Sequence, residues 1–302
     1  MITRRCLLQT LPAAMAAQTA EARTEFQIAC MSLPYQASSF RRAVQGIAQA
    51  GFRYIAWGPN TTDASGRRAP LLADHAPASA AVELAKVSRD AGLEPVLMFG
   101  AVYPERPEFV ETYKHRIEQA HAAGIPNILC FGSPQAKPEE YAPTVRSLRA
   151  VAPIAKQAGI TIGVKQHGGI TATGRMTARV IAEVAHESVR LFYDAGNVWW
   201  YTGEDANIDF AACGAEARGF AIKDFRAAGK LRATCGPGFG QTDHYKMLSR
   251  IARAGGKIPL AFENISQPFT ARPNTPEDVD ALARRAREYM ETVVAGVHAA
   301  AV

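Results

Sequence analysis

The 302-residue chain has no uninterrupted apolar run of about 18 residues, the length at which a helix can cross a membrane. Its five cysteines form no C-x-x-C pair, so a structural zinc site is not expected. No G-x-x-x-x-G-K-[ST] motif is present and no G-x-G-x-x-G follows the first apolar run, so both phosphate-binding fingerprints are missing. The net charge is +6, but the basic residues are dispersed, which argues against a nucleic-acid partner. With 48% apolar residues, the chain can form one large core.

One pattern occurs five times: a helical stretch ends in a small residue and glycine, and a short hydrophobic run follows. The glycines are 41, 32, 35 and 96 residues apart, so the longest interval has room for two further units. A glycine that ends a helix before a buried strand is typical of the βα unit of a parallel barrel. The five glycines are Gly51, Gly92, Gly124, Gly159 and Gly255.

Eight short apolar runs followed by turn signals predict buried parallel strands. They are Phe26–Ser32, Tyr54–Trp57, Pro95–Phe99, Asn127–Phe131, Thr161–Lys165, Leu191–Asp194, Gly219–Lys223 and Pro259–Glu263. Amphipathic stretches predict helices at Phe40–Ala50, Val82–Ala91, Phe109–Ala123, Tyr141–Ala158, Ala178–Glu187, His244–Ala254 and from Pro276 to about Val297. We therefore predict a single (β/α)8 TIM barrel over residues 23–302. A doubly wound open sheet also alternates strands and helices and is the alternative.

The first 22 residues are predicted to be a leader and not part of the barrel. Arg4 and Arg5 precede an alanine-rich stretch that ends in Ala20-Glu21-Ala22. Adjacent arginines at this place are typical of a twin-arginine signal peptide, although the apolar stretch is interrupted. The sequence thus favours export to a bacterial periplasm, with an ordinary basic tail as the alternative.

Polar residues lie at or just after the ends of the last four predicted strands, where a parallel barrel has its chemistry. Lys165, Asp194, Lys223 and Glu263 are the last residues of the fifth to eighth predicted strands, and His167 and Asn197 come shortly after the fifth and the sixth. The first strands end mostly in apolar or small residues, such as Trp57. One polar and one apolar wall would suit a sugar, with its hydroxyl groups and its apolar ring face.

These strand ends resemble the xylose-isomerase-like barrel superfamily, which includes sugar-phosphate isomerases and epimerases, ketose 3-epimerases and hydroxypyruvate isomerases. The resemblance extends from about Phe26 to Val297 and is most specific in VKQHGG, YDAGN, AIKDF and AFEN. The K-x-H-G-G motif and the glycine-rich stretch Cys235–Gly240 resemble an exported branch of that superfamily.

The resemblance implies a divalent metal held by a glutamate, an aspartate, a histidine and a second glutamate from the last four strands. Asp194 and Glu263 match two of these positions. Lys165 stands where the first glutamate is expected, and Ala221 stands where the histidine is expected. A divalent metal (Mn, Zn or Mg) would therefore lack two of its expected ligands, and the cofactor stays open.

Two facing carboxylates in a poorly solvated barrel mouth need a cation. We expect the Lys165 ammonium to lie between Asp194 and Glu263, near the position that a metal would take. The alternative is a metal held by His167, Asp194 and Glu263, because imidazole and carboxylate groups suit Mn, Zn or Fe. A third interpretation is that the acids are salt-bridge partners that stabilise the barrel.

The candidate catalytic residues are thus Lys165, His167, Asp194 and Glu263. The candidate substrate-binding residues are Asn197, Lys223, Trp57 and Trp199. Trp199 and its aromatic neighbours are interpreted either as a platform for a sugar face or as loop packing. The stretch Cys235–Gly240 is expected to be a mobile wall of the site with an exposed cysteine.

Together these features predict an exported carbohydrate-active isomerase, epimerase or lyase that abstracts a proton next to a carbonyl of a sugar or keto-sugar. Lys165 and His167 are the candidate bases, and Glu263 is the alternative base if a metal is bound. The expected partner is a small, unphosphorylated carbohydrate, and homo-oligomer formation is left open. The alternative is a catalytically inactive barrel that binds a sugar or acts in an assembly.

Overall fold

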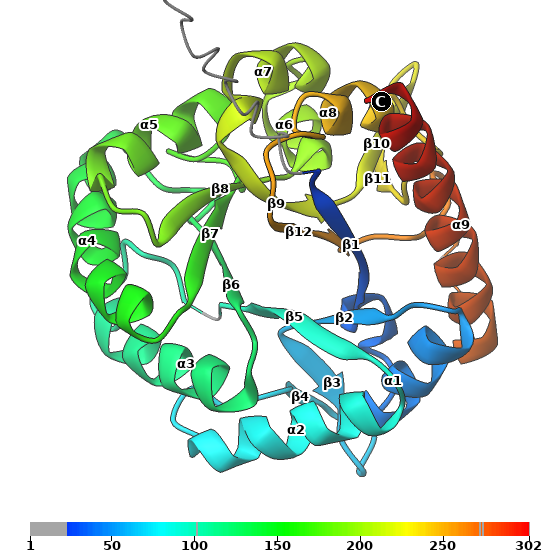
Figure 1. Ribbon diagram of the computed structural model, residues 1–302, viewed down its shortest axis with the longest axis horizontal. Helices are drawn as coiled ribbons and strands as arrows, with labels where there is room; N and C mark the ends of the chain where they lie inside the picture. The colour runs from blue at the N-terminus through cyan, green and yellow to red at the C-terminus, as the bar shows by residue number, and fades with distance from the viewer. Residues whose placement is uncertain (1–22, 101, 272, 274, 302) are drawn as a thin grey trace, which may run out of the picture.

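Eight parallel strands form a closed barrel in the computed structural model, which describes residues 23–100, 102–271, 273 and 275–301. The order around the barrel is β1-β12-β9-β8-β7-β6-β5-β2, as Figure 1 shows. This closure confirms the predicted single (β/α)8 barrel and excludes the open sheet; the predicted leader, residues 1–22, lies outside the described residues. The strands are β1 (Glu25–Met31), β2 (Tyr54–Trp57), β5 (Glu94–Phe99), β6 (Asn127–Phe131), β7 (Thr161–Lys165), β8 (Val189–Tyr193), β9 (Ala217–Ile222) and β12 (Lys257–Phe262).

Helices surround the barrel on its outer side (Figure 1). The helices at predicted positions are α1 (Phe40–Gln49), α2 (Ala78–Asp90), α3 (Phe109–Ala123), α4 (Tyr141–Gln157), α5 (Gly174–Val184), α8 (His244–Ser249) and α9 (Pro276–Ala300). Short 3-10 turns are η1 (Leu33–Tyr35), η2 (Pro138–Glu140) and η3 (Gly214–Glu216). Over the described part of the chain, no helix is long and apolar enough to cross a membrane.

The repeated glycines have the backbone conformation that the repeat predicts. All five have positive φ, between 69° at Gly124 and 89° at Gly51, a region that a residue with a Cβ disfavours. In the long interval, α5 ends at Ala185 with φ 54°, so an alanine takes the place of the glycine there. The two further units for which this interval has room are therefore present in the structure, although they lack the glycine pattern in the sequence.

The stretch after β8 differs from the prediction. Two helices, α6 (Ala195–Thr202) and α7 (Ala206–Cys213), occupy it, and Trp199 lies in α6 rather than in a loop. Asp194 and Asp205 precede these helices and accept hydrogen bonds from their first backbone N–H groups, which is the capping that starts them. The two capping aspartates therefore indicated helices in the sequence, whereas the aromatic run Trp199–Tyr201 had been interpreted as part of a loop.

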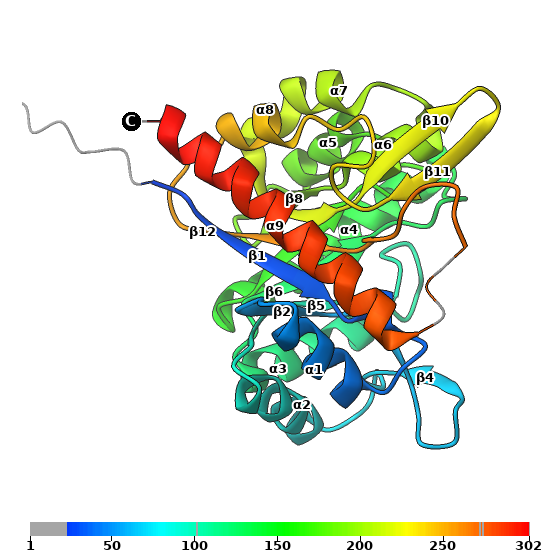
Figure 2. The ribbon, with the colours of Figure 1, turned by 90° about the vertical axis from the view of Figure 1, so that its right-hand side faces the viewer.

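Two antiparallel hairpins also extend the barrel, and neither was predicted. One consists of β3 (Asn60–Thr62) and β4 (Arg68–Pro70), and the other of β10 (Asp224–Ala228) and β11 (Leu231–Cys235). Figure 2 shows both hairpins projecting on the side toward which β1 points. They therefore build up the rim at the carboxyl ends of the barrel strands.

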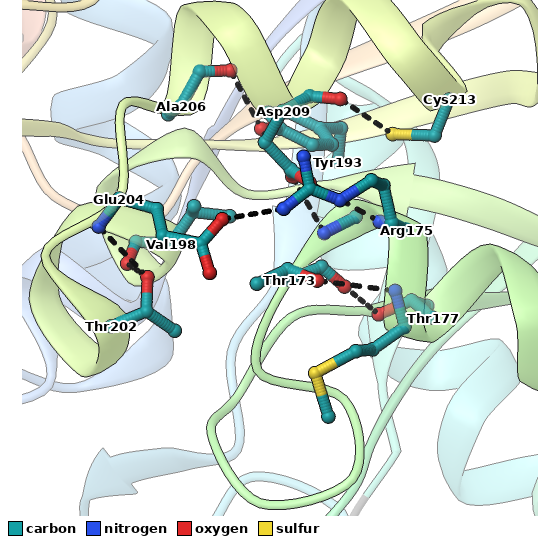
Figure 3. Close-up of polar contacts among 12 residues, drawn as sticks. Thr173, Arg175, Thr177, Tyr193, Val198, Thr202, Glu204, Ala206, Asp209 and Cys213 are labelled. Carbon is teal, nitrogen blue, oxygen red and sulfur yellow. Dashed lines mark hydrogen bonds and ion pairs between the residues drawn. The ribbon is translucent and has the colours of Figure 1, made fainter.

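Asp209 anchors the inserted helix α7 to the barrel. Its carboxylate accepts hydrogen bonds from the Tyr193 hydroxyl of β8 at 3.0 Å and from the Gly174 backbone N–H at the start of α5 at 2.6 Å. Figure 3 shows Asp209 beside Tyr193 and Arg175. Because Asp209 is buried and fully used in these contacts, it fixes the end of β8, where Asp194 follows.

The interior of the barrel is filled by a strand-only cluster around Phe192. Gly163 and Gly219, on the strands to either side of β8, leave the space that the Phe192 ring occupies. Small side chains such as Ala29 and Ala261 complete this layer. This cluster of packed side chains closes the barrel beneath the carboxyl ends of its strands, so water is excluded from the bottom of the candidate site.

We expect Gly163→Ala to destabilise the protein by about 1–3 kcal/mol, because the added Cβ would overlap the Phe192 ring. In a chain of this size that loss lowers the melting temperature by several degrees, about 2–4 °C per kcal/mol. Gly296→Ala is the matched control, since Gly296 lies in α9 with room for a methyl group and alanine favours helix. Equal melting temperatures of the two variants would contradict this account of the barrel interior.

Candidate functional site

Four charged side chains meet at the carboxyl ends of four neighbouring strands. Lys165 is the last residue of β7, Asp194 follows β8, Lys223 follows β9 and Glu263 follows β12. These strands are adjacent in the barrel, so their ends lie together although the residues span about a hundred positions of sequence.

Two lysines bridge the two acids. Lys165 Nζ lies 2.9 Å from Asp194 Oδ2 and 2.5 Å from Glu263 Oε2. Lys223 Nζ lies 2.5 Å from Glu263 Oε1 and 3.3 Å from Asp194 Oδ2. Lys165 therefore lies between the acids, as expected, while the participation of Lys223 is new. Two positive and two negative charges balance, and we call these four residues the ionic cluster.

The members of the ionic cluster differ in exposure. The side chains of Lys165 and Asp194 are 1% and 0% exposed, whereas those of Lys223 and Glu263 are 9% and 11% exposed. Lys223 and Glu263 also line a cavity of about 500 Å³, which we call the lysine cavity. Lys165 and Asp194 are thus closed off from solvent, whereas Lys223 and Glu263 are accessible to a ligand in the lysine cavity.

The protonation states follow from burial and from the neighbouring charges. Burial alone would raise the pKa of Glu263, but the positive charges of Lys165 and Lys223 outweigh it and hold that pKa far below its ordinary value. Burial alone would lower the pKa of Lys223, but attraction to Asp194 and Glu263 raises it. Burial is the largest influence on Asp194 and raises its pKa. The cavity therefore presents a carboxylate beside an ammonium group.

The donor set of this site does not fit a divalent metal. At the four positions where the resemblance implies ligands stand Lys165, Asp194, Ala221 and Glu263, and an ammonium group cannot ligate a cation. Throughout residues 23–100, 102–271, 273 and 275–301, no three His, Cys, Asp or Glu side chains are grouped to hold a metal. The alternative set of His167, Asp194 and Glu263 is thus not assembled around one point.

Asn197 and Gln166 hold Asp194 in place. The Asn197 backbone N–H donates to Asp194 Oδ1 at 3.0 Å, and its side-chain amide donates to the Gln166 carbonyl at 2.7 Å. The Asp194 backbone N–H donates to Gln166 Oε1 at 2.7 Å. All three residues are buried, so Asn197 ties the start of α6 to the end of β7, while its predicted contact with substrate stays a prediction.

His167 lies beside the ionic cluster rather than in it. Its Nδ1 is 2.9 Å from the Gly132 carbonyl, and its ring contacts Phe131, Tyr103 and Tyr201. Burial, and then the charge of Lys165, lower the pKa of His167 from 6.5 to about 4. The ring is therefore neutral at pH 7, and because a carbonyl only accepts, Nδ1 carries the proton and Nε2 is left as an acceptor.

The aromatic candidates occupy different places. Trp57 is buried and lines a second cavity of about 650 Å³, which we call the aromatic cavity. Trp199 stacks on Phe225 at 5.9 Å and lines neither cavity. The lysine cavity instead has Phe269, which was not predicted; its side chain is 45% exposed and its φ is 60°. An exposed aromatic residue after the eighth strand was the only sequence signal for it.

The glycine-rich stretch Cys235–Gly240 is hydrogen-bonded to the end of the barrel, while its expected mobility stays a prediction. The buried Asp224 carboxylate accepts from the backbone N–H groups of Gly240 at 2.9 Å and Thr242 at 3.0 Å. Cys235 is fully buried rather than exposed, because it ends β11 in the hairpin. Asp224, the neighbour of Lys223, thereby ties this stretch to the end of β9, although none of the residues Cys235–Gly240 lines the lysine cavity.

A family model described as xylose isomerase-like TIM barrel matches residues 44–285. Among solved structures, L-ribulose 3-epimerase is 16% identical, with a TM-score of 0.68 over 93% of this chain and 97% of that one. A xylose isomerase-like TIM barrel protein from Mycobacterium smegmatis in complex with magnesium is 13% identical, with a TM-score of 0.70 over 90% and 97%. D-psicose 3-epimerase with D-tagatose from Clostridium cellulolyticum H10 is 12% identical, with a TM-score of 0.66 over 89% and 99%. At these identities the similarity shows the shared fold, and no curated protein matches the chain significantly.

We expect the wild-type protein, purified without chelator, to contain far less than one equivalent of Mn, Zn or Mg and to melt at the same temperature with Mn²⁺ or with EDTA. Lys165→Glu places a third carboxylate beside Asp194 and Glu263, so Mn²⁺ should raise its melting temperature. Lys246→Glu, on the solvent-exposed side of α8, is the matched control and should not respond. Stoichiometric, tightly bound metal in the wild type would contradict the two-lysine description.

The low pKa of His167 predicts an acid-dependent loss of stability. Between the ordinary pKa of 6.5 and the native value of about 4, the unfolded chain takes up a proton that the native ring does not, so stability falls as the pH falls through this window. Urea unfolding at pH 7 and pH 4 should show that the wild type loses about 2–3 kcal/mol more than His167→Gln. His121→Gln is the control, because His121 makes the same 2.9 Å contact to a backbone carbonyl but is exposed. Parallel pH dependence of wild type and His167→Gln would refute the assignment.

Proposed function

Because the chain belongs to the family of xylose isomerase-like TIM barrels, we propose that it is an enzyme that moves or removes a proton next to the carbonyl group of a sugar or keto-sugar. Isomerisation, epimerisation and β-elimination of an oxidised sugar share this first step. The observation that carries the proposal is the pair of Glu263 and Lys223, which are 2.5 Å apart and line the same cavity. Proton abstraction needs a base and a group that stabilises the oxyanion, and this pair supplies both.

Glu263 is the proposed base. In the free enzyme two ammonium groups hold its carboxylate, and its low pKa makes it weakly basic. A substrate carbonyl that accepts a hydrogen bond from Lys223 withdraws one of these donors from Glu263. The same contact thus polarises the substrate and raises the basicity of the carboxylate at the moment when both are needed.

The proposed step transfers a proton and an electron pair among Glu263, Lys223 and the substrate alone. Glu263 takes the proton, the electron pair of the broken C–H bond forms a C=C bond, and the carbonyl oxygen becomes an oxyanion beside the Lys223 ammonium. Return of the proton to the other face of the same carbon gives an epimer. Its transfer to the former carbonyl carbon, while the proton of the neighbouring hydroxyl passes to the oxyanion, gives an isomer. Departure of a β-substituent with its bonding pair gives elimination instead.

Lys165 has a positioning role in this proposal, in place of the role as base that the sequence suggested. Its side chain is 1% exposed and contacts both acids, so it neutralises them from below without reaching the lysine cavity. His167 is half-buried and neutral, and its free Nε2 suits it to accept a hydrogen bond from a substrate hydroxyl. Export of the protein stays part of the proposal.

The proposal is tested by incubating the purified protein in D₂O with a panel of aldoses, ketoses and 3-keto sugars and following deuterium uptake by NMR. Glu263→Gln and Lys223→Met should each slow uptake by about 100-fold or more, because each removes one half of the pair. Lys230→Met, in the exposed turn of the β10–β11 hairpin, is the control and should exchange like the wild type.

Unchanged exchange in Glu263→Gln, in protein that still melts cooperatively, would remove Glu263 as the base. Absence of exchange with every sugar, alongside measurable sugar binding, would favour the catalytically inactive, sugar-binding barrel.

A further inference from the structure

The aromatic cavity lies at the same mouth of the barrel as the ionic cluster but holds none of its charges. Trp57, Phe99 and Phe131 line it from the ends of β2, β5 and β6, across the barrel from the ends of β9 and β12. We propose that this cavity binds an apolar, ring-containing substituent, so that the substrate is a glycoside of a keto-sugar, or a similarly substituted keto-sugar, rather than a free monosaccharide. This inference rests on the proposed function, because it assigns the sugar part to the lysine cavity.

The size of the mouth supports a two-part substrate. The lysine cavity has a volume of about 500 Å³ and the aromatic cavity about 650 Å³. Each alone falls in the range of about 300–1,000 Å³ that holds a drug-sized ligand, and a single sugar ring is smaller than that. A sugar placed against Lys223 and Glu263 therefore leaves the aromatic cavity to another group.

The lining of the aromatic cavity selects an uncharged, apolar group. Its lining residues include Trp57, Met98, Phe99, Tyr103 and Phe131, which have large aromatic or apolar side chains. Its internal charges are already paired, since Arg116 donates to Asp74 at 2.7 Å and is buried. A phosphate or carboxylate would find this cation in use, whereas an aromatic ring would find flat partners.

Two nitrogen atoms of the lining residues have no hydrogen-bond partner among the described residues. They are the Trp57 indole Nε1 and the Arg116 Nε, and both atoms are buried. The wall therefore offers a ligand no accessible polar atom at these two positions, which suits an uncharged ring better than a polar group.

Phe131 lies between the aromatic cavity and the ionic cluster. Its ring lines the aromatic cavity, packs against the His167 ring at 5.0 Å and lies 5.7 Å from Lys165 Nζ. Tyr103, which also lines the cavity, contacts both Phe131 and His167. A substrate whose sugar lies at the ionic cluster would thus extend over Phe131 and His167 into the aromatic cavity without crossing a charged group.

The experiment compares paired methyl and phenyl glycosides of glucose, galactose and xylose, with phenol as a separate probe, by isothermal titration and saturation-transfer NMR on the full chain. The phenyl member of a binding pair should bind at least about tenfold more tightly, because its ring is buried against aromatic side chains. Leu71→Trp should fill the cavity and bring the phenyl-to-methyl ratio close to one while leaving methyl glycoside affinity unchanged. Asn60→Trp, on the paired strand of the same hairpin, replaces it if Leu71→Trp does not fold.

The matched control is Leu231→Trp, the same exchange at a 60% exposed residue of the β10–β11 hairpin that lines neither cavity. It should keep the wild-type ratio. Equal affinities of the phenyl and methyl members, or a ratio that Leu71→Trp leaves unchanged, would overturn the inference. Deuterium exchange of free sugars would persist in that case, whereas failure of the proposed function alone would abolish exchange and leave phenyl binding intact.

Discussion

Charge balance at the barrel mouth is the constraint on which the site depends. Two carboxylates, Asp194 and Glu263, lie where desolvation makes a lone negative charge costly, and two ammonium groups touch both of them. Removing one partner leaves a charge uncompensated, so the four residues act as a unit. In the metal site that the sequence resemblance implies, the same acids would face a divalent cation, and here two monovalent cations supply the same total charge.

The barrel provides the precision that such a cluster needs. Each member follows a different strand, and the four strands are neighbours in one closed sheet. Phe192 closes the barrel beneath the site, Asn197 and Gln166 fix Asp194, and Asp224 ties the glycine-rich stretch to the end of β9. These supports are buried and hydrogen-bonded, so the charged groups keep their geometry while the rim above them carries the parts that contact a ligand.

Most of the barrel could be predicted because each repeated unit carries two sequence signals. One is a glycine that takes positive φ at the end of the helix, and the other is the short apolar run of the next strand. All eight predicted strands lie within two residues of the observed ones. The helices α6 and α7 were missed because the aromatic run Trp199–Tyr201 resembled a loop platform, although Asp194 and Asp205 are good caps. The ion pair of Lys165 was predictable from a vacated ligand position. The contacts of Lys223 to the same acids were not, since they depend on the direction of its side chain at the end of β9, which no local pattern encodes. The aromatic cavity likewise combines strand ends and loops that lie far apart in sequence.

If the two lysines replace a metal, the site has hydrogen-bond donors instead of a strong Lewis acid, which favours substrates whose α-proton is already acidic.

The most direct test of the ionic cluster is ¹⁵N NMR of the Lys223 side chain between about pH 7 and pH 11, across the ordinary lysine pKa of about 10.4. The account predicts that Lys223 stays an ammonium group at the upper end while exposed lysines lose their protons, and that Glu263→Gln lowers its pKa. Titration of Lys223 together with the exposed lysines would contradict the ionic cluster as the basis of the site.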